Sequence, residues 1–132
     1  MTQEVFYLGY EDALAAYREA VGAANDSPGT LVRNSDTLEA ILMRPRQLAV
    51  HSDADIVAQA AALMRGIAHE QPWRAGNRRA AIQLAFTFLL LNGYEVAATE
   101  EEVLDLAAGL AHSGSQLDVE EVDAWLRSHV SQ

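Results

Sequence analysis

One polar stretch in the middle of the chain decides the expected fold: His69-Glu70-Gln71-Pro72-Trp73-Arg74-Ala75-Gly76-Asn77-Arg78-Arg79. It separates two apolar segments with helical spacing, over residues 53–68 and 80–91, and the second of these ends at Asn92-Gly93. Arginines, a glycine and an asparagine therefore gather at the first turn of what we expect to be the most buried helix. Free backbone N–H groups and the positive end of the helix dipole make this turn a candidate anion site.

Helical patterns dominate the rest of the chain as well. Apolar residues recur on one face over residues 10–21 and 36–43, and capping boxes at 99–102 and 118–121 predict two more helices. We expect Ser35 to cap the second of these helices and Pro45 to follow its end, so that residues 44–50 form a turn and connection. Breaker residues predict a loop over residues 25–29 and a break at residues 113–115.

Together these elements predict one all-α domain over residues 1–132, a bundle of about six helices. A third helix is expected to start near Ser52 or Asp53. The helix beginning near Asn77 is apolar on nearly every side, which places it at the centre of the bundle. Residues 94–96 have extended character, and we expect one short β pairing between them and residues 5–8.

Composition limits the classes of function. A chain of 132 residues that is half apolar suits a single core, and no apolar run reaches the ~18–20 residues that span a bilayer. The absence of cysteine excludes thiolate chemistry, and the absence of lysine excludes a Schiff base or a phosphate-binding lysine. From the net charge of −10 we expect no binding to nucleic acid. From the lack of a membrane-spanning run and of cysteine we expect no membrane and a cytoplasmic location. Four of the nine arginines nonetheless lie between Arg65 and Arg79, which favours a small anionic ligand.

The turn from Gly76 to Arg79 has two interpretations. Glycine lets a ligand approach the backbone, Asn77 can present its amide, and the guanidinium groups of Arg78 and Arg79 can bind phosphate oxygens, with Arg74 close by. The alternative is an ordinary helix capped by asparagine and carrying two solvated arginines. Cations at a helix N-terminus oppose the dipole by a few tenths of a kcal/mol up to ~1 kcal/mol, a cost that a bound anion would offset.

Several motifs together resemble the Fic/Doc family, and within it the death-on-curing toxins of bacterial toxin–antitoxin modules. The family signature runs His-Pro-Phe-x-Asp-Gly-Asn-Lys-Arg-Thr-Ala, followed by an apolar helix that ends in Asn-Gly. The matching segments lie within residues 30–95: Thr37–Gln47, Ala60–Ala68, Pro72-Trp73, Gly76–Ala81, Phe88-Leu89 and Leu91–Tyr94. The resemblance implies a Fic/Doc-type helical bundle that binds ATP or another nucleotide. For the Doc branch it implies phosphotransfer onto translation elongation factor Tu, and an antitoxin peptide as a partner.

Two departures from the signature fall on catalytic positions. Gln71 stands where the family has its catalytic histidine, and Ala75 stands where it has the acidic residue that helps to hold the metal–nucleotide complex. A glutamine amide does not accept a proton near neutral pH, and alanine offers no oxygen to Mg²⁺. Arg78 replaces the lysine of the Doc branch. We therefore expect impaired catalysis, no metal site, and phosphate binding that is retained by Gly76, Asn77, Arg78, Arg79 and Arg74.

Among the histidines, one is an outside candidate for the missing base. His69 lies two residues before the catalytic position, and an insertion in the loop could bring it there, although Ala68–Pro72 matches the family without a gap. The other interpretation of His69 is a helix C-terminal cap. His51, His112 and His129 lack the short spacing of a zinc site.

Three functional hypotheses follow from these observations. The first is a Doc-like phosphotransferase relative with lost or severely reduced activity that still binds a nucleotide or an elongation-factor partner. The second is a non-enzymatic interaction protein that uses the fold to bind a partner segment such as an antitoxin tail. The third is an active enzyme with altered chemistry, in which His69 or the ligand's own phosphate is the base.

Overall fold

Helices make up most of the structure, a computed structural model that describes residues 4–111 and 117–132. The helices within these ranges are α1 (Tyr10–Val21), α2 (Pro28–Leu31), α3 (Ser35–Ser52), α4 (Ile56–Glu70), α5 (Asn77–Leu91), α6 (Glu100–Ala111) and α7 (Val119–His129). Two short strands, β1 (Glu95–Val96) and β2 (Val130–Ser131), complete the described elements. The predicted all-α bundle is confirmed. The expected number of about six fits the longer helices, because α2 is a single turn of four residues.

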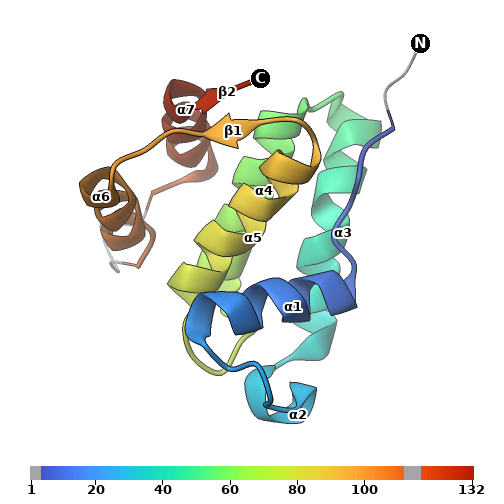
Figure 1. The fold of residues 1–132 in the computed structure, drawn as a ribbon. Helices are drawn as coiled ribbons and strands as arrows, with labels where there is room; N and C mark the ends of the chain where they lie inside the picture. The colour runs from blue at the N-terminus through green and yellow to red at the C-terminus, as the bar shows by residue number, and fades with distance from the viewer. Residues whose placement is uncertain (1–3, 112–116) are drawn as a thin grey trace.

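The centre of the bundle is the helical hairpin of α4 and α5, which lie side by side (Figure 1). Helix α3 packs on α4, α1 packs on α5, and α6 and α7 cover the opposite side of the hairpin. The prediction that α5 is central is confirmed, since it buries residues around much of its circumference: Ala80, Ala81, Leu84, Ala85, Phe88 and Leu89. The polar stretch that joins α4 to α5 therefore lies at one end of the core.

Helix α3 is longer than the sequence predicts. It continues through Pro45 to Ser52, so the expected turn over residues 44–50 is wrong. A proline inside a helix costs about 3 kcal/mol, but Pro45 is buried and the packing of α3 on α4 outweighs that penalty. The expected cap Ser35 is also wrong, because the Asn34 side chain accepts the N–H of Thr37 at 3.0 Å.

Other expected boundaries are partly corrected. Helix α4 begins later than expected, at Ile56, because the side chain of Asp55 accepts the N–H of Ala58 and caps it. The predicted loop over residues 25–29 turns into α2 at Pro28, since proline suits the first turn of a helix. Both predicted capping boxes are confirmed, at 99–102 and 118–121. His112 and the predicted break at 113–115 lie outside the described residues.

The predicted β pairing has a different partner. Residues 95–96 pair antiparallel with 130–131, not with 5–8. The N-terminal segment is held instead by the side chain of Asn92, whose amide accepts the Phe6 N–H and donates to the Phe6 carbonyl, both at 2.9 Å. The Asn92 side chain thus satisfies the Phe6 N–H and carbonyl, the groups that a neighbouring strand would otherwise have bonded. This explains why the predicted pairing with residues 5–8 is wrong. No helix in the described part of the chain has the length and apolarity to cross a membrane.

Candidate anion-binding site

The loop between α4 and α5 turns sharply at both of its ends. Gln71 closes α4 with φ +52°, and its N–H donates to the Ile67 carbonyl at 3.0 Å. Gly76 opens α5 with φ +73°, a conformation that glycine adopts at little cost. A Cβ atom at Gly76 would also lie 3.0 Å from Cγ1 of Val21 on α1. Glycine is therefore favoured here by both the backbone geometry and the close approach of α1.

The middle of the loop is anchored by Trp73, which is fully buried. Its ring stacks on Tyr17 of α1 with 4.0 Å between centroids, and Trp73 forms an antiparallel β-bridge with Val32. The Tyr17 hydroxyl donates to the Ala75 carbonyl at 2.6 Å. Burial, assisted by the charge of Asp26, raises the pKa of Tyr17, so the phenol remains protonated as a donor. The loop is consequently a fixed part of the fold.

Asn77 fixes the loop from its other end. Its side-chain oxygen accepts the Trp73 N–H and its side-chain amide donates to the Trp73 carbonyl, both at 3.0 Å. The structure therefore uses the amide of Asn77, a predicted phosphate ligand, to hold the loop. The first hydrogen bond within α5 runs from the Ala80 N–H to the Gly76 carbonyl. The N–H groups of residues 77–79 precede it, and these remain for an anion.

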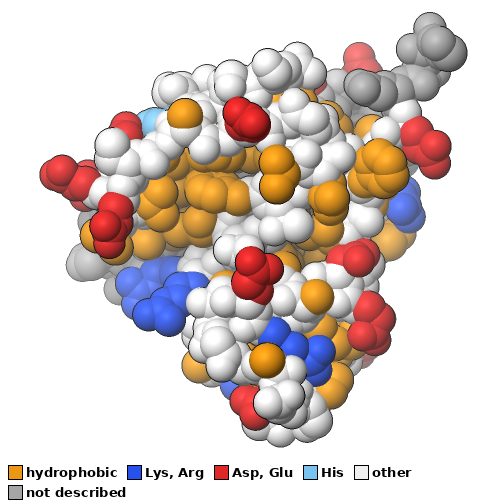
Figure 2. All heavy atoms as spheres, viewed as in Figure 1, with side chains coloured by type: hydrophobic (Ala, Val, Ile, Leu, Met, Phe, Trp, Pro, Cys, Tyr) orange, Lys and Arg blue, Asp and Glu red, His pale blue; other side chains and the backbone are white. Residues whose placement is uncertain are grey.

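A cavity of about 740 Å³ opens at this N-terminus. Its volume is in the range of small-molecule sites. Residues from α1, the end of α4, the α4–α5 loop, the first turns of α5, and α6 line it: Ala20, Ala68, Gln71, Arg74, Ala75, Gly76, Asn77, Arg78, Arg79, Ile82, Gln83, Val103, Leu104 and Ala107. Figure 2 shows a hollow with hydrophobic side chains between α5 and α6, and arginine side chains below it in that view. One end of the cavity is thus cationic and one wall is apolar.

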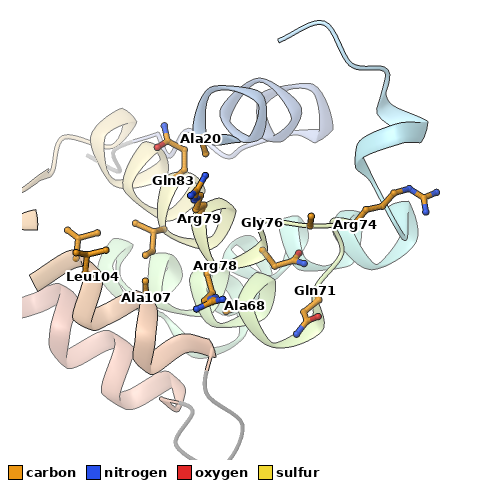
Figure 3. Close-up of a pocket in the computed structure, with 14 residues that line it drawn as sticks. Ala20, Ala68, Gln71, Arg74, Gly76, Arg78, Arg79, Gln83, Leu104 and Ala107 are labelled. Atoms are coloured by element: carbon orange, nitrogen blue, oxygen red, sulfur yellow. The ribbon is translucent and has the colours of Figure 1, made fainter. Parts of the chain in front are cut away.

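The three arginines of the loop region have different roles. Arg78 and Arg79 are exposed, and among the described residues neither guanidinium group forms an ion pair or a hydrogen bond. In Figure 3 their side chains lie on the cavity side of the loop and point apart, while Arg74 points away from both. The Nε of Arg74 donates to the Gly29 carbonyl at 3.2 Å. Arg78 and Arg79 are therefore placed to meet a ligand, whereas Arg74 braces the loop.

Acidic side chains are kept out of the cavity. None of the described residues that line it is aspartate, glutamate or histidine. The carboxylate next to the α4–α5 loop in sequence, that of Glu70, accepts two hydrogen bonds from the Arg44 guanidinium, one of them at 2.9 Å. These bonds hold the pKa of Glu70 below its usual value and raise that of Arg44. The carboxylate is thus charged and already engaged.

The predicted catalytic positions are brought to the cavity without catalytic groups. Gln71 and Ala75 both line it, as do Arg78 and Arg79. The Nε of Arg33 donates a hydrogen bond to the Gln71 carbonyl at 2.9 Å, and an Nη of the same guanidinium donates to it as well. His69 lies within α4 and is not among the residues that line the cavity, so the structure gives no support to its role as a substitute base.

Sequence reasoning missed the wall that α6 contributes. Val103, Leu104 and Ala107 lie far along the chain from the loop, and the capping box at 99–102 predicted only that a helix begins there. Leu104 is 62% exposed, which only the structure reveals. The role of Tyr17 was also missed, because it follows from the stacking on Trp73. No local motif in the sequence signals either contribution.

Comparison with known proteins shows the family of the chain. The structure is a helical domain with a fixed loop, a cationic helix N-terminus and a cavity beside it. The sequence profile described as the Fic/DOC family matches residues 7–89. The chain is also 37% identical over 95 residues, 70% of this chain and 68% of the relative, to the protein named Toxin Doc of Mycolicibacterium smegmatis (strain ATCC 700084 / mc(2)155). The chain belongs to the Fic/Doc family.

Proposed function

We propose that this protein is a Doc-like member of a toxin–antitoxin system that binds ATP or another nucleotide through its phosphate groups. The observation that carries the proposal is the cavity at the N-terminus of α5, with two unpaired guanidinium groups and no carboxylate among its described lining residues. Arg78, Arg79 and the N–H groups of residues 77–79 would hold the phosphates. The apolar wall of α6 would face the rest of the ligand.

The proposal includes impaired catalysis. The family activity implied for the Doc branch is transfer of phosphate onto elongation factor Tu, and it needs a base at position 71 and an acidic residue at position 75. Gln71 and Ala75 reach the cavity but supply neither group. Removing a positioned proton-transfer group commonly lowers a rate by ~10²–10⁴. Binding and turnover are thereby separated in this chain.

A second candidate function rests on the exposed apolar side chains beside the cavity. Leu104 is 62% exposed and lies on the wall formed by α6. An apolar segment of a partner protein, such as an antitoxin tail, would cover this wall without any chemistry. In this alternative the family fold acts as an interaction module, and nucleotide binding is not required.

Calorimetric titration tests nucleotide binding directly. ATP, ADP and AMP are titrated into the unaltered protein and into Arg78→Gln and Arg79→Gln. Because a hydrogen bond to a charged group contributes about 1.5–3 kcal/mol, each substitution is expected to weaken binding about 10- to 100-fold. Arg46→Gln is the matched control, since Arg46 is exposed on α3 and lies over Tyr7, outside the cavity.

The two candidate functions give different outcomes in this titration. Nucleotide binding that is lost in the Arg78 and Arg79 variants and kept in the Arg46 variant supports the first. No binding of any nucleotide to the unaltered protein refutes the first and leaves the interaction module. Equal binding in all variants would place the nucleotide elsewhere on the molecule.

A further inference from the structure

The described residues that line the cavity offer no carboxylate to a divalent cation of the Mg²⁺ type, and their side-chain oxygens are the amide oxygens of Gln71, Asn77 and Gln83, of which that of Asn77 already accepts the Trp73 N–H. The chain has 19 aspartate and glutamate residues, yet none is among the described residues that line the cavity. No group of three histidine, aspartate or glutamate side chains in the described part of the chain could hold a metal ion. Ala75 lines the cavity and stands where the family signature has its acidic residue. The residues present therefore do not fit the metal that the family resemblance implies.

The carboxylate next to the loop cannot easily move in to fill this role. Both oxygens of Glu70 accept hydrogen bonds from Arg44 on α3, so the carboxylate is directed toward the α3–α4 contact. Turning it into the cavity would break these bonds and leave the Arg44 guanidinium without its partner. The charged side chains among the described residues that line the cavity are then those of Arg74, Arg78 and Arg79.

We propose that this cavity binds a polyphosphate group without a divalent cation, with the guanidinium groups of Arg78 and Arg79 neutralising the charge that a metal would neutralise. The proposal rests on the phosphate-binding function proposed above and specifies its ligand class. Consecutive residues project about 100° apart around a helix, so the two side chains reach different walls of the cavity. Figure 3 shows them diverging in this way.

Two separated cations suit two linked phosphate groups better than a single phosphate. A diphosphate that carries no metal keeps its full negative charge for the guanidinium groups and for the helix N-terminus. A bound Mg²⁺ would remove part of that charge. It would also place a divalent cation near two arginines, with no carboxylate among the described lining residues to offset the repulsion. Added Mg²⁺ is therefore expected to weaken binding.

The test compares inorganic phosphate, pyrophosphate and ATP, each titrated calorimetrically with excess EDTA and again with excess Mg²⁺. In EDTA, pyrophosphate and ATP are expected to bind at least about 10-fold more tightly than phosphate, which is the contribution of one additional charge-assisted contact. Excess Mg²⁺ is expected to weaken both. Arg78→Gln and Arg79→Gln each lower the affinity in EDTA about 10- to 100-fold, and Arg46→Gln leaves it unchanged.

Ala75→Asp provides a second variant with the opposite expectation. The new carboxylate lines the same cavity, so it repels a metal-free polyphosphate and offers Mg²⁺ an oxygen ligand. In EDTA, the Ala75→Asp variant is expected to bind pyrophosphate more weakly than the unaltered protein does, and added Mg²⁺ is expected to restore its affinity. Binding by the unaltered protein only in Mg²⁺ overturns the metal-free proposal and leaves phosphate binding intact. An absence of binding under both conditions overturns both.

Discussion

Replacing Asn77 by alanine tests whether this side chain supports the loop. Both of its hydrogen bonds go to the backbone of Trp73, a residue with no exposed surface. The neighbouring β-bridge does not use these two Trp73 groups, because its bonds run from Arg33 to Pro72 and from Arg74 to Leu31. At a net ~0.5–1.5 kcal/mol for each hydrogen bond, Asn77→Ala should lower the free energy of unfolding by about 1–3 kcal/mol.

Urea denaturation, monitored by circular dichroism, measures this loss. The dependence of the free energy of unfolding on urea concentration is expected to stay the same. Asn77→Asp keeps the acceptor for the Trp73 N–H and loses the donor to the Trp73 carbonyl, so an intermediate loss is expected. Gln83→Ala, on the same helix and also lining the cavity, is the control and should stay within ~0.5 kcal/mol of the unaltered protein. A loss below ~0.5 kcal/mol for Asn77→Ala would refute the supporting role.

Three further substitutions test neighbouring features. Gly76→Ala should destabilise the protein by about 1–2 kcal/mol, because φ is +73° there, and a thermal melt that matches the unaltered protein would contradict the strained geometry. Glu70→Gln should cost about 0.5–1 kcal/mol at neutral pH, since the pair with Arg44 is partly exposed. The pKa of Glu70 is lowered in the fold, so this contribution is present above the usual glutamate pKa and is lost as the pH falls through the folded value; a cost that persists in acid would argue against the pair. Hydrogen bonds to the Trp125 carbonyl and to Glu102 raise the pKa of His129, so its contribution is complete below a pH of about 6.5 and is lost as the pH rises through the folded value. The melting temperature of His129→Gln should therefore lie below that of the unaltered protein at pH 6, and the difference should be smaller at pH 8. An equal difference at both pH values would count against the ion pair.

The features that could be predicted from the sequence are those set by local chemistry. The cap at 118–121, the apolar periodicity of α5 and the glycine at its start each depend on residues close together in the chain. The position of the two arginines at the start of α5 is also local, because Arg78 and Arg79 lie within one turn of Gly76; that they bind an anion stays a prediction. Such features need no knowledge of tertiary contacts, so composition and spacing suffice.

The features that could not be predicted are those decided by packing between distant segments. Pro45 ends a helix by local rules, yet the packing of α3 on α4 carries the helix through it. Arg74 is close in sequence to Arg78 and Arg79, but its side chain donates a hydrogen bond to the backbone carbonyl of Gly29 in a separate segment. The side-chain amide of Asn77 donates to the Trp73 carbonyl, and residues of α6 line the cavity. Neither contact follows from a local pattern in the sequence.

The central claim is that this Fic/Doc chain keeps a phosphate-binding loop and lacks the groups that would make the phosphate react. Transfer of radiolabelled phosphate from ATP to elongation factor Tu tests it most directly, comparing the unaltered protein with the double variant Gln71→His/Ala75→Asp. Histidine is among the residues that tolerate a positive φ such as that of Gln71, so the restored base suits the loop. We expect transfer only by the double variant. Robust transfer by the unaltered protein would contradict the account.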